Sequence, residues 1–234
     1  MFARRFVLAG VVVGACLHGA PLAAADPDAD AAVPARTAFS ARTPMGGWGT
    51  GTENQPRTAL SLSKLYLADY AVRHGDGSPA DRAAAERAIR YSDDVAADIL
   101  GARYPQAIAA IAAEFGLAQT GGGYWGSATT STADVATFLL AKETGDPDSP
   151  LLLWMATAAP TAADGTEQDW GTADLPGVIG TKWAWSDTGV TEVASASFGP
   201  GFVVVAHTTG STDEHTADVF AGASAAVADM VLPG

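Results

Sequence analysis

The sequence is poor in cysteine and lacks long hydrophobic runs. Its one cysteine among 234 residues is Cys16, near the N-terminus. A domain formed by the rest of the chain therefore has no disulfide and no thiol chemistry. No apolar run reaches the roughly eighteen residues that a membrane-spanning helix requires. These absences exclude a disulfide-rich scaffold, a cysteine nucleophile and a transmembrane helix.

Basic residues are also scarce. The chain has 13 lysines and arginines against 26 acidic residues, which gives a net charge of −13 and a pI near 4.4. This charge repels phosphate backbones, so the composition excludes nucleic acid as a partner. Hydrophobic residues make up 48% of the chain and charged residues 17%. That balance suits a packed single domain and excludes disorder over most of the length.

The N-terminus has the pattern of a secretory signal peptide. Arg4 and Arg5 precede the short apolar segment 6–17, and three alanines at 23–25 form a small-residue cleavage site. The segment is too short for a membrane anchor. We therefore expect residues 1–25 to be a signal peptide cleaved near Ala25, and the protein to be secreted or held in the cell envelope.

A second interpretation of this segment concerns Cys16. The residues 13–16, Val-Gly-Ala-Cys, resemble a bacterial lipoprotein box, in which the cysteine would carry a lipid anchor. The alternative is an ordinary cysteine in the apolar segment. The well-formed alanine cleavage site favours this alternative.

The rest of the chain predicts an α+β fold. Residues 26–57 are expected to form a flexible leader and an N-terminal loop, and a domain then covers residues 58–234. Helices are predicted at 58–73, 79–90, 95–101, 105–116, 131–142, 149–159 and 212–232, and strands at 177–185, 190–198 and 202–209. This order predicts a helical block, then an antiparallel sheet of three to five strands, with a C-terminal helix packed on it.

Two of the three lysines that the sequence contains are candidates for chemistry. Lys64 lies in the most apolar predicted helix, one turn after Ser61, where a buried amine that loses its proton can activate a hydroxyl. The alternative is a lysine whose stem is buried and whose amine reaches solvent. Lys182 lies within a predicted strand, where it could equally protect a sheet edge. Lys142 is expected on a solvated helix end.

Three short motifs occur in an order that resembles a known family. They are Ser61-Leu62-Ser63-Lys64, Ser92-Asp93-Asp94 and Thr181-Lys182-Trp183-Ala184. Serine β-lactamases and D-alanyl-D-alanine peptidases, the penicillin-binding-protein-like family, carry Ser-x-x-Lys, Ser-Asp-Asn and Lys-Thr-Gly in this order. The sequences before Ser92 and after Thr129 are also similar to that family. The resemblance covers roughly residues 58–231 and implies the family's α+β fold.

The resemblance implies acyl transfer from a peptide or peptidoglycan-like substrate, without metal or cofactor. Ser61 would be the nucleophile, Lys64 its proton acceptor and Ser92 the proton shuttle to the leaving nitrogen. Lys182 would supply positive charge for a substrate carboxylate. The strands at 177–185, 190–198 and 202–209 are expected to form an antiparallel meander, and backbone N–H groups of Ser61 and of the first strand of this meander would form the oxyanion hole. The residues implied in substrate binding are Thr181, Trp183 and Ala184.

The sequence also departs from the family. Asp94 replaces the usual asparagine and would pair with Lys64, which would keep the lysine protonated. Trp183 and Ala184 replace the hydroxyl residue and the glycine of the third motif. The glutamate that class A enzymes use for deacylation is absent, because Glu114 is the only acid between 101 and 130. Few residues precede Ser61, so the family's N-terminal strands are expected to be short or missing.

Other patterns give weaker signals. His207, Asp213, Glu214 and His215 cluster in the sequence but lack a known metal-ligand spacing, so unrelated histidines are the better interpretation. A Ser-His-Asp triad lacks its Gly-x-Ser-x-Gly elbow. The six tryptophans could line a glycan groove but are more often core residues.

Three hypotheses are open. The first is an exported serine hydrolase of the β-lactamase/D-alanyl-D-alanine-peptidase type, which the two motif lysines favour. The second is a non-catalytic envelope protein with the same fold, binding peptidoglycan or a protein partner, which Asp94, Trp183 and Ala184 favour. The third is an unrelated secreted α+β domain. The first two require Ser61, Lys64, Ser92 and Lys182 to converge on one cleft.

Overall fold

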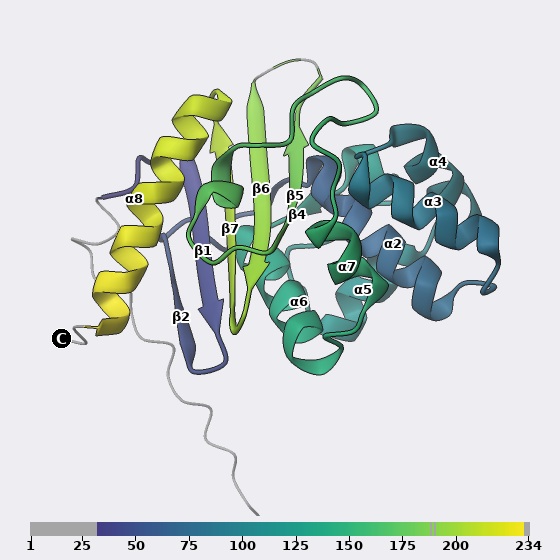
Figure 1. The fold of residues 1–234 in the computed structure, drawn as a ribbon, viewed down its shortest axis with the longest axis horizontal. Helices are drawn as coiled ribbons and strands as arrows, with labels where there is room; N and C mark the ends of the chain where they lie inside the picture. Colours follow the sequence, from purple (N-terminus) through teal and green to yellow (C-terminus); the bar gives the residue numbers. More distant parts are fainter. Residues whose placement is uncertain (1–31, 188, 190, 232–234) are drawn as a thin grey trace, which may run out of the picture.

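The computed structural model describes residues 32–187, 189 and 191–231, so the expected signal peptide and Cys16 lie outside the described residues. The predicted α+β order is confirmed (Figure 1). The strands are β1 (Thr37–Thr43), β2 (Gly46–Gly49), β3 (Arg57–Thr58), β4 (Thr129–Thr130), β5 (Gly180–Trp185), β6 (Glu192–Gly199) and β7 (Phe202–Thr209). The α-helices are α2 (Ser63–His74), α3 (Pro79–Arg90), α4 (Asp94–Arg103), α5 (Ala107–Phe115), α6 (Thr132–Gly145), α7 (Pro150–Ala156) and α8 (Thr212–Val231). Short 3-10 turns are η1 (Leu60–Leu62), η2 (Trp125–Ser127) and η3 (Gly171–Asp174).

The main sheet has five antiparallel strands in the order β2-β1-β7-β6-β5. The expected meander of β5, β6 and β7 is present. The expectation of a loop throughout residues 26–57 is wrong, because β1 and β2 lie within this range and belong to the sheet. The N-terminal strands are therefore present. β2 is short and contains three glycines, so it lacks the alternation of apolar residues that identifies a strand.

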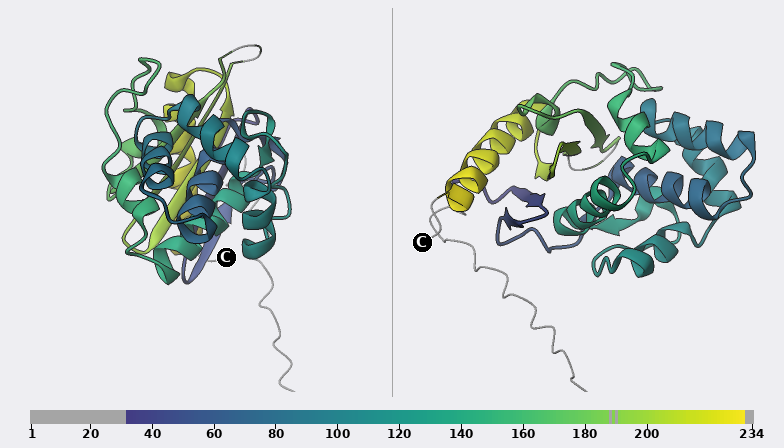
Figure 2. Two further views of the ribbon diagram at one scale, coloured as in Figure 1. Left: turned by 90° about the vertical axis from the view of Figure 1, so that its right-hand side faces the viewer. Right: turned by 60° about the horizontal axis from the view of Figure 1, so that its bottom comes forward.

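Helices cover both faces of the sheet (Figures 1 and 2). Alternation along β7 separates the two cores, because successive side chains of a strand point to opposite faces. Val203 and Val205 pack with the helical block and α6, whereas Val204 and Ala206 pack with residues of α8. None of the helices in the described part of the chain is long and apolar enough to cross a membrane.

Helix α2 lies in the middle of the helical block and is buried along most of its length. The sequence predicts a single helix from residue 58, but the helix begins at Ser63. Thr58 pairs with Thr129 in a small two-stranded sheet, and Leu60 has a φ of 51°. Neither conformation continues a right-handed α-helix. Ser61 therefore lies on the tight turn η1, directly before the first turn of α2.

Candidate active site

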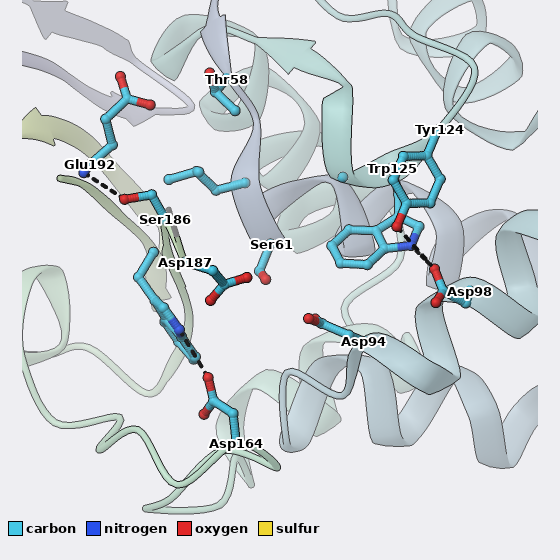
Figure 3. Close-up of a pocket in the computed structure, with 13 residues that line it drawn as sticks. Thr58, Ser61, Asp94, Asp98, Tyr124, Trp125, Asp164, Ser186, Asp187 and Glu192 are labelled. Carbon is cyan, nitrogen blue, oxygen red and sulfur yellow. Dashed lines mark hydrogen bonds between the residues drawn. The ribbon is translucent and has the colours of Figure 1, made fainter. Parts of the chain in front are cut away.

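Ser61 is held at the wall of a cleft by a strained turn. Its neighbour Leu60 and the distant Ser92 are the two non-glycine residues with positive φ among those described, at 51° and 50°. Such strain persists where the surrounding structure enforces it, and it concentrates at functional sites. Ser61 is only 8% exposed, yet its hydroxyl forms no hydrogen bond with a described residue. The hydroxyl points into the cleft (Figure 3).

Lys64 lies one turn further along α2 and is completely buried. Its Nζ donates a hydrogen bond to the Ser92 carbonyl oxygen at 2.6 Å and lies 3.4 Å from the Ser92 hydroxyl. It also forms an ion pair with Asp94, whose side chain is 55% exposed. The ring of Trp125 lies 4.6 Å from the Nζ atom. The expected pairing of Asp94 with Lys64 is therefore present.

Lys182 reaches the same serine from β5. Its Nζ lies 2.7 Å from the Ser92 hydroxyl and donates to the Trp183 carbonyl oxygen at 2.6 Å. This lysine is also completely buried, and among the ion pairs of the described residues it has none. Ser92 thus lies between two amines that belong to different layers of the fold.

The two lysines differ in their electrostatic surroundings. Burial lowers the pKa of Lys64, although the hydrogen bond and charge of Asp94 oppose this effect. Burial lowers the pKa of Lys182 much further, and the neighbouring charge of Lys64 adds to the effect. The arrangement favours a charged Lys64 paired with Asp94 and a neutral Lys182 amine.

The cleft lies in front of this network and has a volume of about 580 Å³. Ser61 and Asp94 line it, whereas Lys64, Ser92 and Lys182 form a buried layer behind them. Its other lining residues are Thr58, Leu60, Asp98, Tyr124, Trp125, Gly126, Asp164, Trp185, Ser186, Asp187 and Glu192. A catalytic serine would therefore face the cleft, while the groups that exchange its proton are shielded from water.

The structure brings Lys64, Ser92, Asp94 and Lys182 into direct contact, and Ser61 lies on the wall of the same site. One expected contact is absent, since the Ser61 hydroxyl and the Lys64 amine form no hydrogen bond. The sequence left a surface position open for each lysine: the amine of Lys64 could reach solvent, and Lys182 could protect a sheet edge. Their complete burial excludes these alternatives.

The expected substrate-binding side chains lie elsewhere. The Thr181 hydroxyl bonds to Ser197, and the Trp183 indole donates to the Trp170 carbonyl oxygen. Ala184 is packed into the main core. None of the three is among the described residues that line the cleft, and their role in substrate binding stays a prediction. The alternation of β5 explains this, because Thr181 and Trp183 point to the face opposite Lys182.

The role of Lys182 in binding a substrate carboxylate also stays a prediction, which its surroundings do not favour. Its amine is buried behind the cleft and is engaged by Ser92 and a backbone carbonyl. A neutral, enclosed amine offers little attraction to an anion in the cleft. In this protein Lys182 is a neighbour of Ser92 and not a lining residue.

Several lining residues were missed because they come from helix α4, from loops and from sheet ends that lack a motif. Asp98 accepts hydrogen bonds from the Trp125 indole at 2.8 Å and the Tyr124 hydroxyl at 3.3 Å. Asp164 accepts one from the Trp185 indole at 3.1 Å. The loop that carries Tyr124 and Trp125 was recognisable, but its position beside Ser61 depends on tertiary structure.

The clustered histidines form no metal site. His215 contacts Ser195 through Nε2 at 2.7 Å and Thr208 through Nδ1 at 2.8 Å, so both ring nitrogens are engaged. Its pKa is lowered to about 4 by burial. Within the described residues, no group of three or more metal-ligating side chains comes together.

Comparisons with known proteins identify the fold. No family model matches the sequence, and no curated protein matches it. Solved structures do match. A β-lactamase from Sphaerobacter thermophilus DSM 20745 has a TM-score of 0.67 at 15% identity, covering 89% of this chain and 99% of that chain. A β-lactamase from Burkholderia vietnamiensis has a TM-score of 0.62 at 17% identity, covering 88% and 95%.

A third match is penicillin-binding protein D2 from Listeria monocytogenes in its cefotaxime-bound form. Its TM-score is 0.60 at 16% identity, and the match covers 80% of this chain and 95% of that chain. The chain therefore has the fold of serine β-lactamases and penicillin-binding proteins, as the sequence motifs implied. At these identities the likeness concerns the fold.

Proposed function

We propose that this protein is an exported serine acyl-transfer hydrolase that acts on a peptide or cell-wall peptide. The observation that carries the proposal is the Ser61 hydroxyl, which has no hydrogen-bond partner among the described residues, is held by a strained turn and points into a cleft. Directly behind the cleft, Ser92 contacts two buried amines. A nucleophile and a proton-transfer group held in one site are the elements that acyl transfer requires.

Ser92 and Lys182 provide the proton route in this proposal. Ser61 Oγ attacks the acyl carbon, and its proton passes through the Ser92 hydroxyl to the neutral Lys182 amine. The tetrahedral intermediate then collapses, the bond to the leaving nitrogen breaks, and that nitrogen receives the proton by the same route. Water attacks the resulting ester, which releases the acid and regenerates Ser61. Lys64 has a positioning role, because its ion pair with Asp94 favours the protonated form.

The oxyanion would be stabilised by two backbone N–H groups. Ser186 donates its N–H to the Glu192 carbonyl, so the N–H groups of even-numbered residues of β5 point towards β6. The N–H of Trp185, an odd-numbered residue, therefore points away from β6 and out of the sheet at its β5 edge. Trp185 and Ser61 both line the cleft, and their N–H groups are the candidates for the oxyanion hole.

The test is covalent labelling of Ser61 by a small neutral fluorophosphonate, followed by intact-mass spectrometry. The expected result is one adduct on the wild type and none on Ser61→Ala. The matched control is Ser63→Ala, which removes a buried hydroxyl two residues away that bonds to the Leu60 and Trp125 carbonyls. An unlabelled wild type, or an adduct that persists in Ser61→Ala, would reject the proposal.

A second candidate function is a non-catalytic envelope protein that binds peptidoglycan or a protein through the same cleft. The pairing of Asp94 with Lys64 favours it, because a protonated Lys64 does not accept the Ser61 proton. This candidate predicts ligand binding without any covalent adduct. The labelling experiment therefore distinguishes the two candidates.

A further inference from the structure

The charge of the cleft is of one sign. Every charged side chain among its described lining residues is acidic: Asp94, Asp98, Asp164, Asp187 and Glu192 (Figure 3). The two lysines of the site are buried behind it. A cleft lined by one sign of charge concentrates ions of the opposite sign. The negative potential of this cleft therefore attracts cations and repels anions.

Three of these five carboxylates form no ion pair within the described part of the chain, although Asp187 interacts electrostatically with Lys64 and Asp164 with Lys182. Asp94 pairs with Lys64, and Glu192 interacts electrostatically with Arg57. Asp98, Asp164 and Asp187 form no ion pair with a described residue. The partners of Asp98 and Asp164 are neutral indole, hydroxyl and backbone donors. Burial raises the pKa of Asp164, but its hydrogen bonds outweigh that effect and lower the pKa, so it stays ionised.

Aromatic rings accompany the carboxylates on both walls of the cleft. Trp125 is hydrogen-bonded to Asp98 on one wall, and Asp164 lies on the other wall, where it accepts a hydrogen bond from the Trp185 indole. Aromatic faces beside carboxylates form the usual environment for an ammonium or guanidinium group. The Trp125 ring already lies 4.6 Å from the ammonium of Lys64. The same chemistry is available to a cationic ligand.

The unpartnered Ser61 hydroxyl gives an independent indication that this cleft receives a ligand. Ser61 is only 8% exposed, so it is more than nine-tenths buried, and it lies between the two tryptophan–aspartate walls. We infer that the acyl donor of this site is a peptide-like molecule with an ammonium or guanidinium group. This inference rests on the proposed acyl-transfer function. It differs from the expectation of a substrate carboxylate, because none of the described residues that line the cleft is a cation.

The test compares three thioesters that differ only in side-chain charge. They are the thioesters of N-acetyl-lysine, N-acetyl-norleucine and N-acetyl-2-aminoadipate, which are cationic, neutral and anionic. The rate of Ser61 acylation is followed by intact-mass spectrometry. We expect the lysine donor to react about fivefold faster than the norleucine donor, and the aminoadipate donor to react slowest. This preference should weaken as salt is added.

Asp98→Asn and Asp164→Asn should each lower the ratio of the lysine rate to the norleucine rate. The matched control is Asp148→Asn, which removes the same charge from an exposed residue outside the cleft and should leave the ratio unchanged. Equal rates for the three donors, or an equal effect of Asp148→Asn, would overturn the inference. The proposed function would survive that result if the neutral fluorophosphonate labels Ser61.

A binding measurement tests the cationic specificity independently of the acyl-transfer function. Tryptophan fluorescence of Ser61→Ala is titrated with N-acetyl-lysine amide and, separately, with N-acetyl-norleucine amide. Saturable binding of the lysine compound alone supports the cationic specificity even if no donor acylates the wild type. Equal or absent binding of both compounds, together with equal acylation rates, rejects it.

Discussion

Lys64 and Lys182 share one hydroxyl group, that of Ser92, at 3.4 and 2.7 Å. The two amines come from a helix and a strand that are far apart in the sequence. Two ammonium groups at this separation would repel each other strongly in a buried site. The ion pair with Asp94 decides which one keeps its proton. The result is one charged and one neutral amine on either side of a single proton carrier.

Replacing Asp94 should therefore activate the site. In Asp94→Asn, Lys64 loses the partner that raises its pKa, so a second neutral amine becomes available one turn from Ser61. We expect fluorophosphonate labelling of Ser61 at pH 7 to accelerate about fivefold. This factor corresponds to about 1 kcal/mol, the free energy of a partly exposed ion pair. The rate is compared with that of Asp148→Asn, which should match the wild type. An unchanged rate across neutral pH would show that Asp94 does not govern Lys64.

Removing the proton route should have the opposite effect. Ser92→Gly retains the positive φ at this position, and Lys182→Met retains most of the side-chain volume. Each should slow acylation of Ser61 by about 100-fold or more. The rate of the wild type should rise with pH as Lys182 loses its proton, and Lys182→Met should lose this inflection. Circular dichroism checks the fold, and a folded Ser92→Gly with wild-type rates would exclude the route.

The charge of the cleft makes a prediction about β-lactams. Penicillin G carries a carboxylate, whereas its methyl ester has the same ring without the charge. We expect the methyl ester to acylate Ser61 about fivefold faster or more, since the cleft repels the anion. Intact-mass spectrometry over time gives both rates. Faster acylation by the free acid would mean that a cation reaches the cleft.

Acid should destabilise the fold through His207. Burial first, then the charges of Arg57 and His215, lower its pKa from 6.5 to about 3. Below pH 6.5 the unfolded chain therefore binds a proton that the folded protein does not, and stability falls as the pH drops. At pH 5 this effect amounts to about 2 kcal/mol for His207 alone.

His207→Leu should remove that contribution, because the Nε2 atom is buried without a hydrogen bond. Urea unfolding at pH 8 and pH 5 measures the change, and the variant should lose less stability between the two than the wild type. The control is Leu153→Ala, an exposed residue without a titratable group, which should retain the wild-type pH dependence. Identical pH dependence in His207→Leu would show that another group causes the acid sensitivity.

The helices and the last three strands were predictable because their signals are local. Ser78 and Pro79 mark the start of α3, and the structure begins it at Pro79. The motif residues Lys64, Ser92 and Lys182 were identified by type and order, and they meet in space. The burial of Lys64 could be expected from the apolar sequence around it.

The rest depended on tertiary structure. β2 owes its place to pairing with β1, since its glycines have no strand preference of their own. The face of the sheet to which the Trp183 side chain points depends on the alternation of side chains along β5. Three residues of a motif do not define that alternation. The acids of the cleft come from α4, two loops and β6. Only the folded chain brings Asp98, Asp164 and Glu192 to the same cavity.

The strand order has a consequence for folding of the nascent chain. β1, made early, is hydrogen-bonded between β2 and β7, and β7 ends at Thr209, close to the end of the chain. Pairing of such distant segments gives a high contact order and slow closure of the sheet. Synthesis of residues 37–199 alone leaves β1 and β6 without the strand that joins them. The sheet therefore cannot close until nearly all of the chain has been made.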